Sequence, residues 1–172
     1  TKKEVIMTRL IKESFVFAVI IIFLSSTYLI FSWNKYNNEA SAMALSLVES
    51  VEAFIPDEQI KELSGSSEDL GTPEYEMIKQ NLTELVETAN PIRFAYLMTK
   101  KEDNIVILAD SEASGSAVYS HPGQLYEEAS DIFSETFESG KTVITEPETD
   151  RWGTWISALV PVKDPVSGKT IA

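Results

Sequence analysis

The sequence predicts an α+β fold that follows one long N-terminal helix, and three features carry this prediction. The first is an apolar stretch without any charged residue, 14–34, which reads SFVFAVIIIFLSSTYLIFSWN. The second is a series of helical patterns that follow it. The third is a set of short β-branched and aromatic segments separated by polar turns, without the strand and helix alternation of a parallel sheet. Together these features predict an antiparallel sheet with helices on one side.

The apolar stretch 14–34 has the length and composition of a transmembrane helix. At 1.5 Å per residue it is long enough to cross a hydrocarbon core of about 30 Å. A cleavable signal peptide is the alternative, because Ala40-Ser41-Ala42 supplies an A-x-A pattern. The apolar run is longer than the usual signal core of about 7–15 residues, and the A-x-A pattern does not directly follow it. Trp33 and Tyr36 also lie where aromatic residues anchor a span at the interface.

The charges orient this helix in the membrane. Residues 1–13 hold four bases and two acids, which are Lys2, Lys3, Arg9 and Lys12 with Glu4 and Glu13, so 25 of the 27 acids and 10 of the 14 bases follow the span. Because basic residues beside a span stay inside the cell, residues 1–13 are expected to be a cytoplasmic tail and residues 35–172 an extracytoplasmic domain. An acidic domain repels phosphate backbones, so no nucleic-acid partner is expected. The chain has no Cys, which excludes disulfides and thiolate metal sites.

The segment 35–54 contains no Pro or Gly and continues the helix beyond the membrane. Its apolar residues recur every three or four positions, at Tyr36, Ala40, Met43, Leu47, Val51 and Phe54. Such a stripe either packs on the domain that follows or pairs with the same helix of a second chain. We therefore expect Met43, Leu47, Val51 and Phe54 to serve transmission or dimer contacts. Pro56 should end this helix.

Two further helices and a short one are expected in the domain. A short helix 56–64 should begin at Pro56 and stop at Gly65. Thr72 and Pro73 provide an N-cap and a first helical residue for a helix that runs to about Ala89. Its apolar face comprises Tyr75, Ile78, Leu82, Leu85 and Val86. A later amphipathic pattern, ended by Gly140, comprises Leu125, Ala129, Ile132, Phe133 and Phe137.

The expected strands fall into two groups. The segments 92–99 and 105–110 flank the polar turn 100–104 and predict a β-hairpin. A short strand 142–145, an acidic loop 146–151 and an aromatic strand 152–162 follow the last helix. A turn at 163–169 then leads into a strand at 170–172, where the sequence is cut off.

No catalytic or metal-binding constellation stands out in the sequence. His121 is the only histidine and has no nucleophile motif beside it, so a loop-anchoring or surface role is the better interpretation. Glu146, Glu148 and Asp150 could gather oxygens around a calcium ion, but a solvated acidic loop fits better. The Asn81-Leu82-Thr83 glycosylation pattern lies within a predicted helix. We therefore expect no enzymatic activity in this region and no cofactor.

Several residues and the order of elements resemble the Cache or PDC family, the extracytoplasmic PAS-like sensor domains of membrane signalling proteins. They are Phe94-Ala95-Tyr96, Asp110 at a strand end, His121-Pro122-Gly123, and the segment 152–158 (WGTWISA) with Pro161. The resemblance implies an antiparallel PAS-like sheet of about five strands flanked by helices. It also implies an output domain, such as a histidine kinase, diguanylate cyclase or chemoreceptor module, and a second membrane helix beyond residue 172.

The resemblance further implies a ligand pocket against one face of the sheet. Its expected lining is Tyr96, Asp110, Tyr126, Trp152, Trp155 and Ser157. Asp110 would hold a ligand amine, and Arg93 would pair with a ligand carboxylate. The alternative is that the aromatic residues are ordinary core and Asp110 caps a turn. Alternation along the first strand separates Phe94, Tyr96 and Met98 from their neighbours, and the face that lines the pocket stays open.

From these residues we expect the input region of a transmembrane receptor in the cytoplasmic membrane. It would bind a small molecule such as an amino acid or organic acid, act as a homodimer, and pass a conformational change inward. A membrane-anchored extracytoplasmic hydrolase is one alternative. An assembly domain that binds no ligand is the other.

Overall fold

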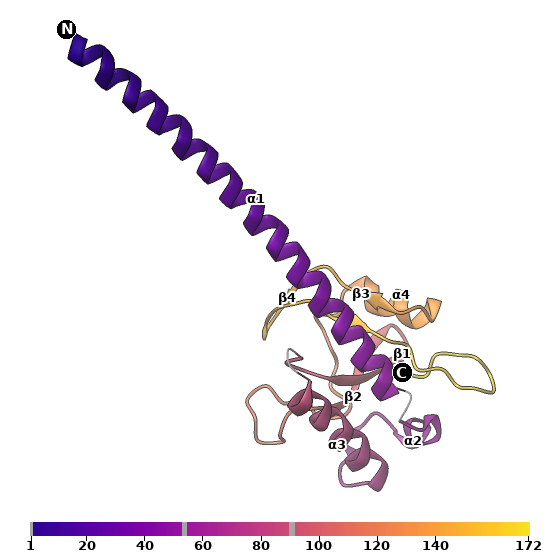
Figure 1. Cartoon of the computed structure of the whole chain (residues 1–172). Helices are drawn as coiled ribbons and strands as arrows, with labels where there is room; N and C mark the ends of the chain where they lie inside the picture. Colours follow the sequence, from indigo (N-terminus) through magenta and orange to yellow (C-terminus); the bar gives the residue numbers. More distant parts are fainter. Residues whose placement is uncertain (1, 53–54, 90–91) are drawn as a thin grey trace. The chain divides into compact units, whose positions relative to one another are not determined.

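The computed structural model describes residues 2–52, 55–89 and 92–172, except for the side chains of residues 4, 5, 8, 51 and 52. The chain divides into two compact units, Thr1–Ala40 and Ser41–Ala172. Helix α1 (Lys2–Glu52) contributes residues to both units (Figure 1).

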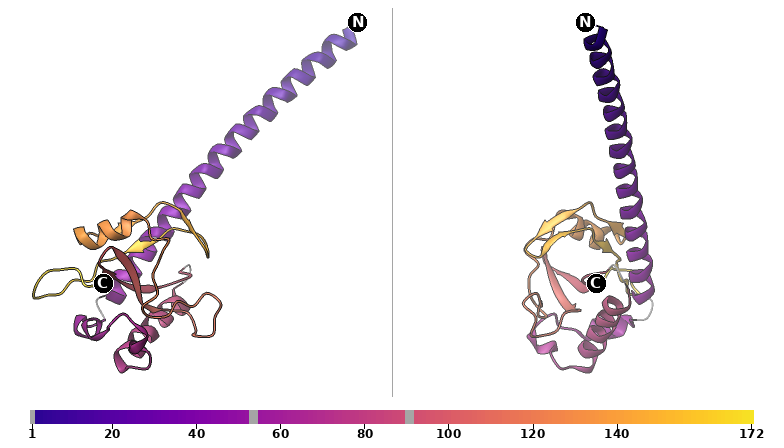
Figure 2. Two further views of the ribbon diagram at one scale, coloured as in Figure 1. Left: turned by 180° about the vertical axis from the view of Figure 1, so that it is seen from behind. Right: turned by 60° about the vertical axis from the view of Figure 1, so that its left-hand side comes forward.

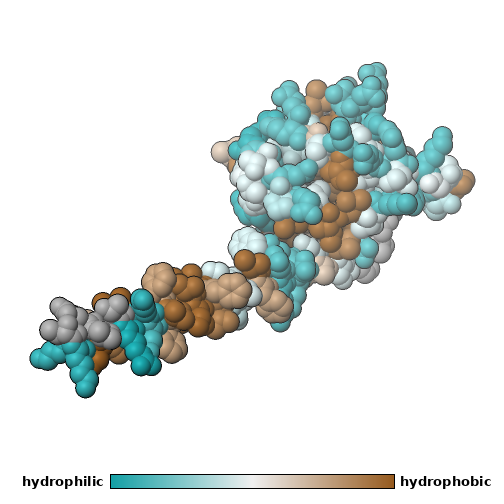
Figure 3. All heavy atoms as spheres, turned by 90° about the horizontal axis from the view of Figure 1, so that it is seen from above, coloured by the Kyte–Doolittle hydropathy of each residue, from teal (hydrophilic) through white to brown (hydrophobic). Residues whose placement is uncertain are grey.

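The first unit is helical throughout its described residues, and its middle stretch 14–31 carries no charged residue. Every residue from 9 to 31 is exposed. On the face that Figure 3 shows, the middle of this helix is hydrophobic and its N-terminal end is partly hydrophilic. Phe15, Ile22 and Phe31, for example, are between 65% and 69% exposed. Helix α1 is long and apolar enough to cross a membrane, with a mean hydropathy of 2.4 in its most apolar window. An exposed helical stretch without charged residues suits lipid better than water.

The last turns of α1 belong to the second unit and pack on its core. The half-buried apolar residues here are Ala44, Leu45, Leu47 and Val48. Leu47 contacts the hydrophobic core, as expected for one of the two interpretations of the predicted stripe. Met43 remains 45% exposed. The side chain of Val51 and the whole of Phe54 lie outside the described residues.

Two short helical turns connect α1 to the main helix of the unit. Helix α2 (Asp57–Glu62) has Pro56 as its N-cap, so it begins one residue later than predicted. The 3₁₀ turn η1 (Ser67–Asp69) lies in the segment after it. The Asp69 carboxylate accepts hydrogen bonds from the backbone N–H of Ser64 at 2.8 Å and of Gly65 at 2.8 Å. The Asp69 side chain therefore stabilises the loop between α2 and η1.

Helix α3 (Pro73–Thr88) begins as the sequence predicts. The Thr72 hydroxyl accepts a hydrogen bond from the backbone N–H of Tyr75 at 3.3 Å, and Pro73 is the first helical residue. The buried side chains of α3 are Tyr75, Ile78, Leu82 and Leu85, which form most of the predicted apolar face. They pack against the hairpin that follows, so α3 covers one face of that hairpin.

This hairpin consists of β1 (Tyr96–Lys101) and β2 (Asn104–Asp110), paired antiparallel. Ala95 and Leu97 point into the core with α3, and they are 9% and 7% exposed. Phe94 and Tyr96 therefore lie on the opposite face, because side chains alternate along a strand. Tyr96 pairs directly with Asp110. The face of β1 that carries Phe94 and Tyr96 therefore points away from the core that α3 covers.

The segment after the following loop corrects one sequence prediction. Residues 123–126 run along β2, where the Ile107 N–H donates to the Gln124 carbonyl at 2.9 Å and the Tyr126 N–H to the Ile105 carbonyl at 2.9 Å. Leu125 is consequently extended and 46% exposed. Helix α4 (Asp131–Ser139) begins only at Asp131, and Gly140 ends it in a left-handed conformation with φ 59°, as predicted.

The strands after α4 form one irregular antiparallel hairpin. Strand β3 (Val143–Ile144) pairs with β6 (Ala158–Leu159), and β4 (Glu148–Asp150) pairs with β5 (Gly153–Trp155). Between the two pairs, the Thr145 N–H donates to the Ser157 carbonyl at 2.9 Å. The acidic loop predicted at 146–151 is thus partly strand β4, and the strand predicted at 152–162 is interrupted.

The second unit is α+β, as the sequence predicts. Its named strands form three two-stranded sheets, and the single sheet of about five strands is not formed by the described residues. After the predicted turn at 163–169, the Ile171 N–H donates to the Val162 carbonyl at 2.9 Å. Within this unit, β1 and β2 lie between α2 and α3 on one side and α4 with its hairpin on the other (Figure 2).

Candidate functional site

A group of aromatic rings and two carboxylates gathers on the face of β1 that points away from α3. We call it the aromatic-carboxylate cluster, and it comprises Phe94, Tyr96, Asp110, Tyr126, Asp150, Trp152 and Trp155. Its members come from three parts of the chain, namely the β1–β2 hairpin, the segment that runs along β2, and the β4–β5 hairpin. Residues distant in sequence therefore meet here.

Asp150 joins the parts of the cluster. Its Oδ2 accepts a hydrogen bond from the Tyr126 hydroxyl at 3.2 Å, and its Oδ1 accepts one from Trp155 Nε1 at 3.1 Å. Oδ1 also accepts from the backbone N–H of Trp152 at 2.8 Å and of Gly153 at 3.1 Å. The last two bonds close the turn between β4 and β5, so one carboxylate shapes the turn and aligns two aromatic side chains.

Gly153 allows the Trp155 ring to lie against this turn. A Cβ at Gly153 would lie 2.8 Å from Cζ2 of the Trp155 indole, which is closer than real contacts allow. The φ of Gly153 is 145°, which side chains rarely tolerate. Glycine is therefore required for the observed position of the indole.

The rings pack edge to face or tilted across the strands. The Phe94 and Trp155 rings are 5.2 Å apart at 79°, and the Phe94 and Tyr96 rings are 6.0 Å apart. The Tyr126 ring lies 6.3 Å from Trp152 and 5.4 Å from Phe133 of α4. Such pairs each stabilise packing by about 0.5–1.5 kcal/mol beyond the area that they bury.

Asp110 is fully buried at the end of β2, beneath the loop 111–120. Its carboxylate accepts hydrogen bonds from the backbone N–H of Ser120 at 2.6 Å and from that of Glu112. Burial raises the pKa of Asp110, although these two N–H groups and the Lys79 ammonium oppose the shift. Asp110 thus caps the loop, which was one of its two predicted roles, and its charge stays close to the cluster.

Helix α3 fastens the same loop from the other side. Lys79 Nζ donates to the carbonyl oxygens of Asp110 at 2.8 Å and Glu112 at 2.5 Å. The hydroxyls of Tyr75 and Tyr119 are 3.0 Å apart. The loop beside the cluster is therefore anchored on the core helix.

Burial and the negative charge of Asp150 raise the pKa of both tyrosines of the cluster. Burial raises the pKa of Tyr96, and the negative charges of Asp110 and Asp150 raise it further. Burial also raises the pKa of Tyr126, followed by the charge of Asp150 and its hydrogen bond. Both phenols therefore stay protonated at neutral pH and can donate hydrogen bonds.

Two arginines lie at the outer edge of the cluster. The Arg93 guanidinium carbon is 4.2 Å from the centre of the Phe94 ring, and its Nη1 is 2.6 Å from Glu112 Oε1. Arg151 lies 5.0 Å from the Trp152 ring and pairs with Glu128 through two bonds, of 2.5 and 2.6 Å. Each cation thus already has an acidic partner.

Five of the seven predicted ligand-binding residues meet in the cluster, namely Tyr96, Asp110, Tyr126, Trp152 and Trp155. Arg93 lies at its edge and is exposed. Ser157 instead holds the hairpin, because its N–H donates to Thr145 Oγ1 at 3.0 Å. His121 is exposed, and its Nδ1 lies 3.2 Å from its neighbour's carbonyl oxygen.

Sequence reasoning missed the central role of Asp150. We interpreted it as part of a solvated acidic loop, yet it is half-buried and accepts four hydrogen bonds. The sequence Asp150-Arg-Trp-Gly could have indicated this role. An Asp at the first position of a turn often accepts hydrogen bonds from the backbone N–H groups of the residues that follow it.

The described residues contain no group of three His, Asp or Glu side chains placed to hold a metal ion. Comparisons of the chain with protein-family models, with curated proteins and with solved structures gave no match. The interpretation of the site therefore rests on its own geometry.

Proposed function

We propose that this chain is the ligand-sensing input region of a transmembrane receptor and that the aromatic-carboxylate cluster binds a small solute. One observation supports the proposal most directly. Aromatic rings from three chain segments and two carboxylates, Asp110 and Asp150, gather on one sheet face, and the second carboxylate links two of those segments. Aromatic walls with a few fixed polar groups are typical of small-molecule sites.

The chemistry of the cluster favours a ligand with an amine group, such as an amino acid. Carboxylates and aromatic faces both attract ammonium groups. An organic acid would instead need Arg93 or Arg151, and these are paired with Glu112 and Glu128. Binding of an acid would thus have to break an existing ion pair.

Transmission would proceed through β1, which carries the cluster on one face and packs in the hydrophobic core on the other. Tyr96 lies in β1, whose other face packs in the same hydrophobic core as Leu47 of α1. A ligand that prefers one arrangement of β1 and the β4–β5 hairpin would shift this packing, with a typical coupling of about 1–3 kcal/mol. In this proposal α1 spans the cytoplasmic membrane with its N-terminus inside, and the exposed Met43 is available to a second copy.

Thermal unfolding of the full chain in phosphatidylcholine nanodiscs tests the proposal. We expect at least one solute from a panel of amino acids, amines and organic acids to raise the melting temperature in a concentration-dependent way. Trp155→Leu, which removes the indole next to Asp150, should abolish this shift, whereas His121→Ala should retain it.

Two results would count against the proposal. One is the absence of any shift with the whole panel. The other is an equal shift in the native chain and the Trp155→Leu variant, provided that each folds with a cooperative melting transition.

A further inference from the structure

Three lysines gather around the C-terminal end of α4, away from the aromatic-carboxylate cluster. Seven of the ten basic residues after the span pair with acids or donate to carbonyl oxygens, and they are Lys35, Lys61, Lys79, Arg93, Lys100, Lys101 and Arg151. Within the described ranges, no carboxylate or carbonyl oxygen accepts from the ammonium groups of the other three, Lys141, Lys163 and Lys169. A chain with a net charge of −13 thus leaves three of its cations together.

Two of these lysines, Lys163 and Lys169, line an open hollow of about 340 Å³, which we call the lysine hollow. Gly140 and Thr170 also line it. A Cβ at Gly140 would lie 2.7 Å from Cε of Lys163 and 3.1 Å from its Nζ. The absence of a side chain at Gly140 therefore lets the Lys163 ammonium rest on the end of α4.

The backbone fixes where both lysines start. Lys163 pairs with Thr170 as an isolated β-bridge, and the Asp164 N–H donates to the Lys169 carbonyl at 2.9 Å. The turn between them is closed by the Gly168 N–H, which donates to the Asp164 carbonyl at 2.8 Å. Both side chains therefore leave from neighbouring, ordered backbone positions.

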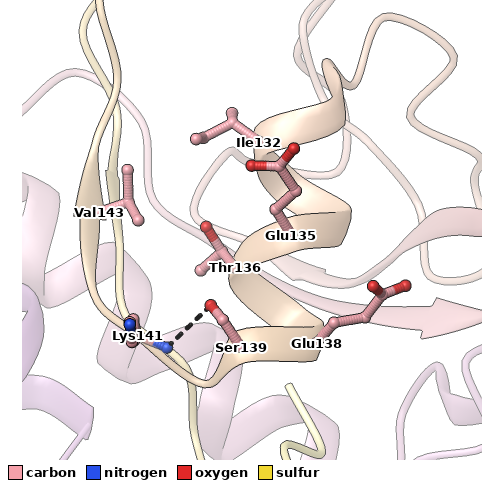
Figure 4. A pocket seen from close by; sticks show the side chains of 7 residues that line it. All are labelled: Ile132, Glu135, Thr136, Glu138, Ser139, Lys141 and Val143. Carbon is pink, nitrogen blue, oxygen red and sulfur yellow. Dashed lines mark hydrogen bonds between the residues drawn. The ribbon is translucent and has the colours of Figure 1, made fainter.

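A neighbouring hollow of about 500 Å³ has different chemistry. It lies between α4 and β3, and its lining includes Ile132, Glu135, Val143 and Lys141 (Figure 4). Glu138 lines both hollows, but Lys100 Nζ lies 2.5 Å from its carboxylate and neutralises it. The lysine hollow is therefore positive, whereas the neighbouring hollow carries the acid Glu135.

We propose that the lysine hollow binds a small anion with phosphate or carboxylate groups. Two ammonium groups on one turn suit the separated charges of a multivalent anion. Thr170, which also lines the hollow, carries a hydroxyl that can donate a hydrogen bond. The volume falls within the usual range for small-molecule sites, roughly 300–1,000 Å³. The rest of the domain is acidic and repels anions. An anion should therefore bind at the lysine hollow in preference to other parts of the surface. The phosphate could belong to a free solute or to a lipid headgroup.

Calorimetric titration of the full chain in phosphatidylcholine nanodiscs with pyrophosphate and with citrate tests this site. We expect saturable binding that weakens as the salt concentration rises. Lys163→Gln and Lys169→Gln should each weaken binding about threefold, and the double variant about tenfold. Lys35→Gln removes the same charge elsewhere and should leave binding unchanged. Lys141→Gln removes a charge from the neighbouring hollow, and unchanged binding there would show that the neighbouring hollow is not the site.

Acetylation of lysines, followed by mass spectrometry, distinguishes the two sources of phosphate. Protection of Lys163 and Lys169 by pyrophosphate in phosphatidylcholine would support a free solute. Protection without pyrophosphate, in nanodiscs that contain phosphatidylglycerol, would support a lipid headgroup. The proposal is overturned if neither condition protects them relative to Lys141, or if the double variant binds both anions like the native chain. Because these residues lie outside the aromatic-carboxylate cluster, either result leaves the sensor proposal to its own test.

Discussion

The two halves of the Ser41–Ala172 unit are stabilised in different ways. In the half built from α2, α3, β1 and β2, apolar side chains fill a continuous core, and Ile78 and Ala109 are 0% exposed. Every buried member of this core except Val162 lies between Ile55 and Ala109. The half built from α4 and the hairpin 143–159 depends instead on aromatic edges and on the hydrogen bonds of Asp150.

This difference bears on how a sensor could work. The aromatic-carboxylate cluster lies where the two halves meet, with Tyr96 and Asp110 from the first and Asp150 and Trp155 from the second. Segments with few buried apolar contacts open at lower free energy than a packed core. We therefore expect the hairpin to move against a steady β1–β2 platform when the cluster is occupied.

The largest expected difference between the halves follows from truncating a core residue. Ile78→Ala on α3 should lower the free energy of unfolding by about 3 kcal/mol, because it leaves a cavity among fully buried side chains. Ile144→Ala on β3, where the side chain is 38% exposed, should cost under about 1 kcal/mol. Urea unfolding followed by tryptophan fluorescence measures both values. Equal costs would show that the hairpin half has a core of its own.

A second variant should loosen only the hairpin half. Asp150→Ala leaves four donors without their acceptor and should cost about 1–3 kcal/mol, mostly within residues 143–159. Hydrogen exchange read by mass spectrometry should show faster exchange there and unchanged exchange in α3. Glu146→Ala, an exposed acid of the same hairpin, is the matched control and should change neither region. Faster exchange in α3 as well would mean that the two halves unfold as one.

The N-caps of α3 and α4 offer a smaller comparison of the same kind. Thr72→Ala removes a hydroxyl that accepts the Tyr75 N–H and should cost about 1 kcal/mol. The Ser130 hydroxyl at the start of α4 is buried and has no hydrogen-bond partner within the described residues. Ser130→Ala should therefore be neutral within about 0.5 kcal/mol or slightly stabilising. Thermal unfolding measures both, and a larger loss at Ser130 would contradict this difference.

The sequence predicted the packed half better than the hairpin half. Helix α3 was predicted from Thr72, Pro73 and a periodic apolar face, because capping and hydrophobic periodicity are local signals. The β1–β2 hairpin followed from alternating residues around a polar turn. In this half, the residues that form the predicted apolar faces are the ones that are buried in the core.

In the hairpin half, tertiary pairing overrode the local pattern. Leu125 and Ala129 have helical spacing with Ile132, yet the backbone of residues 123–126 bonds to β2 and stays extended. The strand predicted at 152–162 begins only at Gly153, because the Asp150 carboxylate holds the Trp152 N–H in the turn. It is interrupted at 156–157, where the Ser157 N–H donates to the Thr145 hydroxyl and not to a backbone carbonyl. Such long-range pairings leave little trace in a local window. The cluster was partly predicted because its aromatic residues are distinctive, whereas Asp150 resembled the other acids near it.

The smallest expected effect concerns an ion pair between the turn 163–169 and α2. Asp164 Oδ2 lies 2.8 Å from Lys61 Nζ, and its Oδ1 accepts from the N–H groups of Ser167 at 2.9 Å and Val166 at 2.7 Å. The Lys61 bond and these two N–H groups lower the pKa of Asp164 from 3.8 to about 2. The unfolded chain therefore binds a proton at this residue more readily than the folded chain does between these values. It follows that the stability contributed by Asp164 is present above about pH 4 and is lost as the pH falls toward 2.

Comparison of the native chain with Asp164→Asn isolates this contribution from that of the other acids. Between pH 5 and pH 2.5, the melting temperature of the native chain should fall further than that of the variant. This difference should shrink in high salt, because the ion pair is accessible to solvent. Lys61→Gln should raise the pKa of Asp164 toward its ordinary value and reduce the difference without removing it, since the two backbone donors remain. Identical pH profiles for the native chain and Asp164→Asn would mean that the turn is not held to α2 through this carboxylate.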